Sequence, residues 1–472
     1  MALALGDACT FVVNSDGALY SWGNNSHDQL GSFRNEQPIR PMAESTIPAQ
    51  IREFGNHVKM VAAKRSQISC VMKDGTVFTW GETNFDEDSN PTFKAGPPLH
   101  IGRAEFQGEW ATQVACSSCS NWILTDKGSV FYSYTCTRRA DVDPPPPGIT
   151  RAALFAHEDD ASQFYYRQLA PTSLCPRVHF SGMKISMIAT GLAHVLAIGV
   201  VRGLWSWGHN GHGVLGRGSG DNFHTAVPTA VPVFNQHKLT YIATEGCHCM
   251  AVSAGTYDEL GTVLDSGLWG WGYGLDGQLG TGDLKAQSLP TRNQDPCFQH
   301  ENITMVACGA GSTAVLLETG ALYMFGSTES MTWHAWTNRH HFHATGPAVI
   351  GMDLASSAKY YFESYRPQKV NPDHFYGARI VSIAISCTHM AAITENGHLY
   401  MWYGRTIPRL FHPMDEYNAA DPVHFMHQPY FGGTPETRQN QHRLDLSHIA
   451  RYAAGQFRNV HEHRRRVRRM RE

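Results

Sequence analysis

The sequence predicts an all-β fold, a seven-bladed β-propeller, and three observations support that prediction. First, a two-residue turn ending in Gly recurs seven times along the chain of 472 residues. Second, an aromatic residue or its stand-in follows each turn, and the copies are spaced by about 63 residues on average. Third, each copy holds short runs rich in Val, Ile, Tyr, Trp and Thr, which favour strands over helices.

The turns join the two central strands of each copy. Asp-Gly and Asn-Gly suit such hairpins because their backbones accept the positive φ of tight turns. The turns are Asp16-Gly17, Asp74-Gly75, Lys127-Gly128, Arg202-Gly203, Ser266-Gly267, Thr319-Gly320 and Asn396-Gly397. The aromatic positions are Trp22, Trp80, Trp207, Trp271, Phe325 and Trp402, with Ser133 standing in the third copy. We expect the five Trp side chains to be largely buried at equivalent positions.

Each copy also has a first and a last segment. The first is an apolar run ending in a small-residue step, as in "KMVAA", "TQVACS" and "TYIATEG". The last usually holds a Pro before an apolar residue, as in "IPAQI", "VPTAV" and "DPVHF". That makes about four strands per copy, and seven such sheets packed radially can cover one another's faces.

We assign residues 1–425 to the propeller and residues 426–472 to a C-terminal extension. The first residues, "MALALGDACTFVV", already read as the first half of a repeat, so we expect no tail before the propeller. We also expect the last blade to combine strands from both ends, with residues 421–425 against the first repeat near residues 3–13. Closing the ring removes free sheet edges.

The repeat resembles that of the regulator of chromosome condensation family. The residues that carry the resemblance are "WGNNSHDQLG" in the first copy, Gly191-x-x-His194 and Trp207-Gly208-His209-Asn210 in the fourth, and Gly272 with Gly277, Gln278, Leu279 and Gly280 in the fifth. Copies two, three, six and seven lack the Gln-Leu-Gly loop, which makes the chain an outlying member.

The resemblance implies a seven-bladed propeller. For the founding member it also implies guanine-nucleotide exchange on a small Ran-like GTPase, or chromatin binding through an N-terminal tail. The third copy, where that family places its wedge, departs most from the pattern, so no catalytic residue is transferred. Photoreception, as in the plant ultraviolet-B receptor, is not expected, because the segments "GLAH", "GCHC" and "SCTH" lack the Trp of the receptor's motif.

Composition limits the classes of function. A formal net charge of −3 argues against general polyanion binding by the body. No run of about 18 apolar residues predicts a membrane span, and the N-terminus lacks the pattern of a signal peptide. Eleven cysteines, several of them within strands, such as Cys70, Cys116 and Cys308, indicate reduced thiols in an intracellular protein, cytoplasmic or nuclear.

Three segments exceed the basic repeat: 135–176, 327–366 and 404 to about 421. Insertions of this length are either binding loops or solvated excursions.

The C-terminal extension has apolar residues at helical spacing and then an Arg-rich end with seven Arg and two Glu between Arg458 and Glu472. Its candidate partner-binding residues, for an acidic protein or nucleic acid, are Arg464, Arg465, Arg466, Arg468, Arg469 and Arg471. A nuclear import signal and a solubilising tail are the alternatives.

Metal sites find little support. His334, His340, His341 and His343 are weak candidates for Zn²⁺ or Cu²⁺, but no Cys or carboxylate stands at ligand spacing, so a polar surface loop is favoured. Cys116-x-x-Cys119 and Cys247-His248-Cys249 coincide with the small-residue step and the strand after it, which favours a packing role. Asp86, Glu87 and Asp88 suit a solvated loop better than Ca²⁺ or a basic partner.

No phosphate-binding loop opens a helix and no catalytic constellation stands out, so we expect no cofactor and lean against an enzyme. The sequence favours a non-enzymatic protein–protein interaction propeller, a scaffold or a structural component of a larger assembly. Guanine-nucleotide exchange and chromatin binding remain the alternatives.

Overall fold

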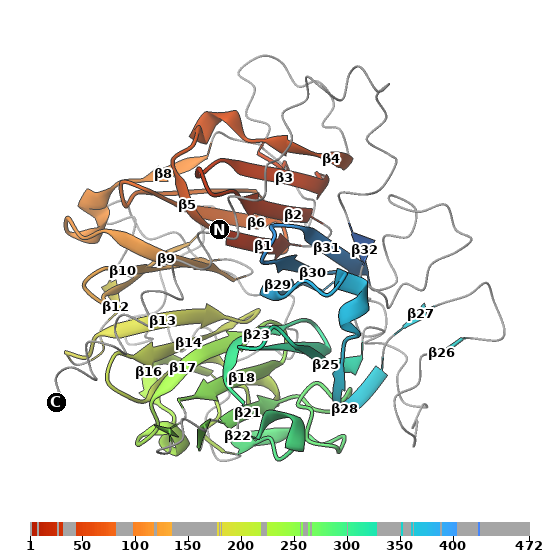
Figure 1. Ribbon diagram of the computed structural model, residues 1–472. Coiled ribbons are helices and arrows are strands. Elements are labelled where there is room, and N and C mark those ends of the chain that lie inside the picture. Colours follow the sequence, from red (N-terminus) through yellow and green to blue (C-terminus); the bar gives the residue numbers. More distant parts are fainter. Residues whose placement is uncertain are drawn as a thin grey trace, which may run out of the picture.

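The computed structural model describes part of the chain: residues 2–6, 9–25, 28–31, 44–81, 98–117, 120–134, 177–178, 180, 182–218, 224–254, 256–257, 263–264, 267–299, 301–327, 351–352, 360–361, 363–387, 389–403 and 423–424. These residues form seven four-stranded antiparallel sheets arranged as the blades of a propeller (Figure 1). The predicted fold class is therefore confirmed.

The first three blades are built from consecutive strands, innermost strand first. Blade one consists of β1 (Ala2–Gly6), β2 (Cys9–Val13), β3 (Leu19–Asn24) and β4 (Glu44–Gln50). Blade two consists of β5 (Val58–Lys64), β6 (Gln67–Met72), β7 (Val77–Gly81) and β8 (Leu99–Ile101). Blade three consists of β9 (Ala111–Cys116), β10 (Ser120–Thr125), β11 (Val130–Tyr134) and β12 (Arg177–Val178).

The other four blades repeat this order. Blade four consists of β13 (Ile185–Thr190), β14 (His194–Gly199), β15 (Leu204–His209) and β16 (His224–Ala230). Blade five consists of β17 (Leu239–Thr244), β18 (His248–Ser253), β21 (Gly267–Gly272) and β22 (Gln287–Arg292). Blade six consists of β23 (Ile303–Cys308), β24 (Ser312–Leu317), β25 (Leu322–Ser327) and β28 (Glu363–Lys369). Blade seven consists of β29 (Ile380–Ile385), β30 (His389–Thr394), β31 (Leu399–Tyr403) and β32 (Val423–His424).

Two short hairpins lie outside the blades. β19 (Thr256–Tyr257) pairs with β20 (Val263–Leu264) between the second and third strands of blade five. β26 (Gly351–Met352) pairs with β27 (Tyr360–Tyr361) between the third and fourth strands of blade six. The fourth strand of blade six begins at Glu363, within the segment 327–366 that the sequence suggested as an insertion.

Antiparallel order divides the connections between two faces of the propeller. The connections from first to second and from third to fourth strands share one face, here called the connection face. The second-to-third turns and the links to the next blade share the other, here called the turn face. On the turn face, short 3-10 helices bury one Phe each between neighbouring blades. They are η1 (Arg52–Phe54), η2 (Arg103–Phe106), η5 (Pro232–Phe234), η6 (Pro296–Phe298) and η9 (Pro372–Phe375); a further one, η4 (Gly211–Gly213), lies on the connection face.

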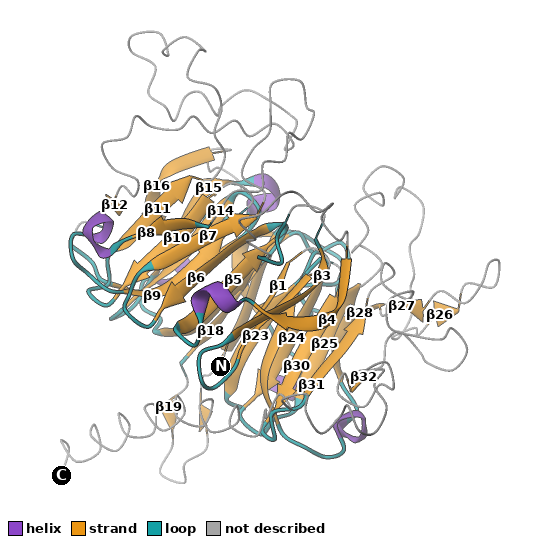
Figure 2. Cartoon of the chain, turned by 90° about the horizontal axis from the view of Figure 1, so that it is seen from above, coloured by secondary structure: helices purple, strands orange, loops and turns teal. Residues whose placement is uncertain are grey.

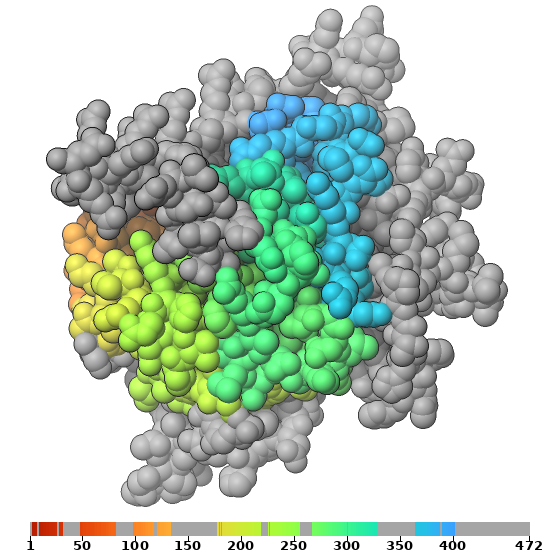
Figure 3. All heavy atoms as spheres, turned by 60° about the horizontal axis from the view of Figure 1, so that its bottom comes forward, coloured from red at the N-terminus to blue at the C-terminus, as the bar shows by residue number. Residues whose placement is uncertain are grey.

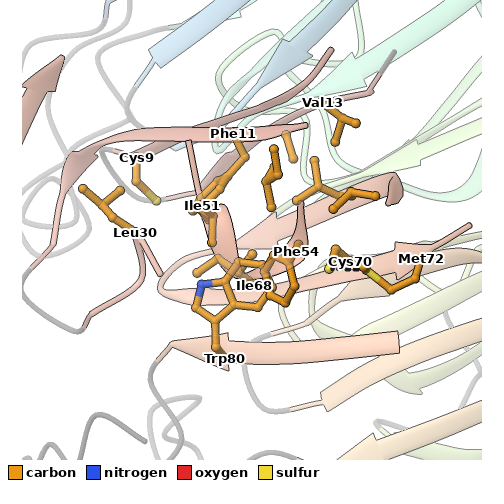
Figure 4. Close-up of a cluster of buried hydrophobic side chains, with 14 residues drawn as sticks. Cys9, Phe11, Val13, Leu30, Ile51, Phe54, Ile68, Cys70, Met72 and Trp80 are labelled. Atoms are coloured by element: carbon orange, nitrogen blue, oxygen red, sulfur yellow. Dashed lines mark hydrogen bonds between the residues drawn. The ribbon is translucent and has the colours of Figure 1, made fainter. Parts of the chain in front are cut away.

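The hydrophobic core is a series of inter-blade layers. Between blades one and two, Phe11 packs edge-on against Trp80 with their ring centroids 6.4 Å apart, and Phe54 lies beside Trp80 (Figure 4). The remaining layers combine buried Val, Ile and Leu side chains of the strands with buried aromatic side chains, among them the Phe of the 3-10 helices. On the face seen in the space-filling view, the colours pass in chain order from orange through green to blue (Figure 3).

The repeat aromatics are buried as expected where their side chains are described. Trp22, Trp80, Trp207 and Trp271 are at most 4% exposed, and Phe325 is fully buried. Ser133 is also buried at the equivalent position of blade three. The side chain of Trp402 lies outside the described part of the chain.

The expected closure of the ring by a shared blade is wrong. The first and last blades each take all four strands from one continuous stretch of chain, and β32 pairs with β31 of its own blade, not with the first repeat. The segment "ALALG" supplies a complete first strand, with Ala2 opposite Val13. The ring closes by packing: β1 lies beside β29 (Figure 1), and Leu5 and Val12 join Ile393 in one buried cluster.

None of the short helices in the described residues has the length or apolar character needed to cross a bilayer.

Candidate functional site

The innermost strands of blades two to five end at a buried polar cluster on the connection face. Each strand ends in the small-residue step seen in the sequence, which lets the backbones approach one another near the propeller axis. Four residues form this axial cluster: Lys64 of blade two, Cys116 of blade three, Thr190 of blade four, and Glu245, which follows the first strand of blade five.

Lys64 joins blades that are not neighbours. Its Nζ donates to the Thr190 carbonyl oxygen at 2.9 Å, to Oε2 of Glu245 at 2.5 Å and to the Glu245 carbonyl oxygen at 3.5 Å. The side chains of Lys64 and Glu245 are 5% and 18% exposed. Taking an ammonium and a carboxylate out of water is costly unless both find partners, and here the three N–H bonds match three acceptors. The pair therefore ties blade two to blades four and five across the axis.

Hydrogen bonds between neighbouring first strands complete the axial cluster. The Thr190 hydroxyl donates to the Cys116 carbonyl oxygen at 2.5 Å, and the Cys116 thiol donates to the Ala62 carbonyl oxygen at 3.5 Å. Gln113 adds a two-way amide contact with the backbone of Ile188, at 2.9 and 3.0 Å. Blades two, three and four are thus linked in sequence, and Lys64 spans the arc that they form.

Buried histidines link further blades. Nε2 of His194 contacts the Thr244 hydroxyl at 2.7 Å, Nε2 of His248 contacts Thr313 at 2.8 Å, and Nε2 of His389 contacts Thr10 at 2.9 Å. In each case the histidine begins a second strand, and the hydroxyl belongs to the next blade around the ring. The last of these contacts joins blade seven to blade one.

The protonation state of these histidines follows from their partners. The Thr244 and Thr313 hydroxyls donate their protons to the carbonyl oxygens of His248 and Gln278. In their contacts with His194 and His248 these hydroxyls therefore accept, and the histidine Nε2 is the donor. Burial lowers the pKa of His194, His248 and His389 to about 3. Neutral imidazoles held in this way position blades; they do not exchange protons with a substrate near neutral pH.

The sequence Cys247-His248-Cys249 does not form a chelating site. Strand alternation sends His248 toward Thr313 of blade six, while the Cys249 thiol lies 3.3 Å from Nε2 of His194 in blade four. Burial raises the pKa of the Cys249 thiol to about 12, which is the opposite of an activated Cys–His pair. Within the described residues no group of three or more His, Cys, Asp or Glu is placed to hold a metal ion.

The Trp residues of the repeat make a second kind of inter-blade link. Trp80 Nε1 donates to the Gln29 carbonyl oxygen at 2.9 Å, and Trp271 Nε1 donates to the Val214 carbonyl oxygen at 2.8 Å. Both acceptors lie in the loop between the third and fourth strands of the preceding blade. Gly280, at φ 65°, packs directly on the Phe325 ring. The approach is so close that a Cβ on residue 280 would lie 2.8 Å from the ring.

Most site residues suggested by the sequence lie outside the described residues. This applies to the six C-terminal Arg residues, to His334, His340, His341 and His343, to Asp86, Glu87 and Asp88, and to Cys119. Cys116 is described and buried, with its pKa raised to about 12 by burial, so it serves packing and hydrogen bonding.

Sequence reasoning missed the Lys64–Glu245 pair. The available signal was that the small-residue steps "KMVAAK" and "TYIATEG" each carry a charged residue, Lys64 or Glu245, at or just after the inner end of the strand, where the other copies have small or neutral residues. Nothing in the sequence separation of 181 residues indicates that the two side chains meet.

The fold and its inter-blade links define a closed seven-bladed propeller of repeat type. The family model for the regulator of chromosome condensation (RCC1) repeat matches residues 16–70, 203–252 and 265–316, which include the copies with the clearest motifs. Over these residues the chain carries repeats of the regulator of chromosome condensation (RCC1) type, within a seven-bladed propeller.

Individual relatives agree with that assignment. The ultraviolet-B receptor UVR8 of Arabidopsis thaliana is 28% identical over 392 residues, which cover 76% of this chain and 80% of UVR8. The mitochondrial RCC1 domain-containing protein RUG3 of the same plant is 32% identical over 318 residues, which cover 66% of this chain and 62% of RUG3.

Solved structures share the fold. The crystal structure of Prp20p from Saccharomyces cerevisiae has a TM-score of 0.61 at 20% identity, covering 86% of this chain and 85% of that one. Human WBSCR16 has a TM-score of 0.60 at 19% identity, covering 86% of this chain and 93% of that one.

Proposed function

We propose that the chain is a non-enzymatic protein–protein interaction propeller that serves as a scaffold or a structural component of a larger assembly. One observation carries this proposal. The long segments 135–176 and 404–421, and residues 328–362 of the segment 327–366, fall between the third and fourth strands of their blades, so all leave from and return to the connection face. A propeller that gathers its long connections on one face is suited to present them to a partner.

The chemistry of the described residues supports a binding role. The axial cluster satisfies its own donors, and the buried histidines and thiols are held in neutral forms by their surroundings. These groups stabilise the ring, so we look for partner contacts in the connections between strands.

The C-terminal extension, residues 426–472, is proposed as a second contact region beyond a propeller that ends near residue 425. Arg464, Arg465, Arg466, Arg468, Arg469 and Arg471 would act as one electrostatic unit on an acidic partner.

A cytoplasmic or nuclear location is part of the proposal. RUG3 is described as mitochondrial, so fluorescence microscopy of the tagged full chain is needed to test the compartment.

Structures of the family support proteins as the partners. One describes the binding properties of Prp20p to Gsp1p and histones, and another shows Kap60 bound to yeast RCC1 (Prp20). Guanine-nucleotide exchange on a small GTPase is the alternative from another class, and release of labelled GDP from a panel of small GTPases tests it directly. A clear acceleration by the full chain would replace the scaffold proposal.

Cross-linking mass spectrometry in native extract tests the scaffold role. Two variants sharpen it: one with residues 138–173 replaced by a short Gly-Ser linker, and one lacking residues 461–472. Since β11 and β12 pair directly at Val130 and Phe131, the first variant should still fold. We expect cross-links from the connection face to a partner, reduced recovery of that partner in at least one variant, and unchanged circular dichroism in both. A free monomer in native mass measurements of the same extract would contradict the proposal.

A further inference from the structure

One turn on the turn face differs in chemistry from its equivalents. The second-to-third strand turns of blades one, two, three, six and seven carry Asp, Lys, Glu, Asn or Thr beside their Gly. In blade four the same position reads "GVVRG" over residues 199–203, and its two valines point to solvent: Val200 is 53% exposed and Val201 is 73% exposed. Turn positions favour Gly, Pro, Asn, Asp and Ser, so two exposed β-branched residues are a departure that needs a reason.

The valine turn continues into a wider surface. The Val200 backbone N–H donates to the Lys184 carbonyl oxygen at 2.9 Å, and Met183, next to Lys184, is 41% exposed. On the other side, blade three's turn touches the same segment, since a Cβ at Gly128 would lie 2.8 Å from Lys184 Cβ. Blades three and four lie next to each other in Figure 2. The surface, here called the valine-turn patch, consists of Lys127, Met183, Lys184, Val200, Val201 and Arg202.

Three cationic residues share the valine-turn patch with its apolar side chains. Lys184 and Arg202 form no salt bridge with another described residue; the Arg202 guanidinium donates to the Gln236 side-chain oxygen at 2.8 Å. Two carboxylates lie at the blade-three turn: Asp126 is 3.6 Å from Lys127 and accepts the Trp110 backbone N–H, and Glu109 accepts from the Thr125 and Ser129 hydroxyls. Apolar side chains with cations beside them match a partner that offers apolar and negatively charged groups together.

We propose that the valine-turn patch docks a short segment of a partner protein in which Asp or Glu residues flank Leu, Ile or Val. This rests on the interaction role proposed above but uses the opposite face of the propeller. The apolar side chains of the segment would cover Met183, Val200 and Val201, and its carboxylates would pair with Lys184 and Arg202.

The rest of the turn face favours a peptide over a nucleic acid or a membrane. Asp16, Glu318 and Glu395 lie in the equivalent turns of blades one, six and seven. A broad polyanionic surface laid on this face would meet those carboxylates, whereas a short segment contacts the positive sector alone. Phosphate groups would also leave the exposed valines without apolar contact.

The test selects peptides from a random 12-residue library displayed on phage, with the full chain as bait. Selected peptides are then titrated by fluorescence anisotropy against the wild type, V200S/V201S and K184E/R202E. Val227→Ser is the matched control, because Val227 is also in blade four and 66% exposed but lies on the outer strand β16. We expect selected peptides to combine acidic and apolar residues, binding to weaken at least about 10-fold in both patch variants, and the control to bind as the wild type does.

Two results would overturn the inference. One is a selection that yields no peptide sensitive to the patch variants. The other is binding of phosphatidylserine vesicles or of a 20-base-pair DNA that K184E/R202E abolishes, in the absence of patch-dependent peptides. The variant with residues 138–173 replaced is titrated in parallel. Its peptide affinity should equal that of the wild type, so a failure of the connection-face proposal is distinguishable from a failure here.

Discussion

Replacing Lys64 with Met should destabilise the propeller strongly. The substitution keeps the length of the side chain but leaves the Glu245 carboxylate, 18% exposed, without its ammonium, and leaves the Thr190 carbonyl oxygen without that donor. Removing one partner of a buried ion pair costs about 3–5 kcal/mol in unfolding free energy. Since Glu245 keeps some contact with water, we expect a loss near the lower end, about 3 kcal/mol.

The measurement is urea unfolding followed by the fluorescence of the buried Trp side chains, checked against circular dichroism for coincident transitions. Lys59→Met is the matched control, because Lys59 lies on the same strand, β5, and is exposed; it should change stability by less than about 0.5 kcal/mol. The double variant K64M/E245L removes both charges and should recover at least about 2 kcal/mol relative to K64M alone. If K64M were no less stable than K59M, the axial pair would not hold the ring as argued.

Three further predictions concern the inter-blade links. Trp271→Phe should cost about 1–2 kcal/mol, because the Val214 carbonyl oxygen loses the indole N–H and keeps only the weaker Cys249 thiol donor at 3.4 Å. Trp271→Ala should cost about 3–5 kcal/mol, and Trp110→Ala much less, since Trp110 is 42% exposed; urea midpoints that rank otherwise would contradict the assignment. Gly280→Ala should lower the melting temperature more than Gly108→Ala, because both glycines have positive φ but of the two only Gly280 packs on an aromatic ring, that of Phe325. Equal shifts in melting temperature would refute the packing argument. His389, like the other two buried histidines, has a folded pKa of about 3 against about 6.5 unfolded, so its contribution to the unfolding free energy is complete above about pH 6.5 and declines by about 2 kcal/mol between pH 6.5 and 5. His389→Gln should therefore flatten the fall in urea midpoint over that interval. An unchanged slope would mean that His389 is protonated in the folded state.

The repeat made the blades predictable because local chemistry sets them. Positive φ at Gly75 or Gly320 is needed wherever a tight turn joins the second and third strands, and the alternation beyond it places the aromatic residue inside. The same logic identified Ser133 as the stand-in of blade three, and it is buried there. Each of these features depends on residues within one copy, which is why the sequence alone could predict them.

Features that depend on two copies at once were harder to predict. The ring closure was wrong because a chain that begins in a repeat is compatible both with a shared blade and with a complete first blade. The pairing of Ala2 with Val13 shows that the first blade is complete, but the sequence alone does not decide between the two arrangements. Lys64 and Glu245 meet only because blades two to five curve around an axis, a geometry that no local pattern reports. The candidate Arg and His residues beyond the described part of the chain stay predictions.

The degenerate copies are informative about where function should be sought. In blade six Phe325 takes the place of Trp and cannot donate to the preceding loop, yet the carbonyl oxygen of Gln278 still receives a hydrogen bond, from the Thr313 hydroxyl at 2.8 Å. That hydroxyl in turn accepts from His248. The acceptor is satisfied by a different donor, so loss of the motif is not loss of the link. Because this inter-blade link persists where the motif changes, we expect the residues that give the chain its own function to lie on the connection face and at the valine-turn patch. Substitutions there need no replacement donor to keep the blades together.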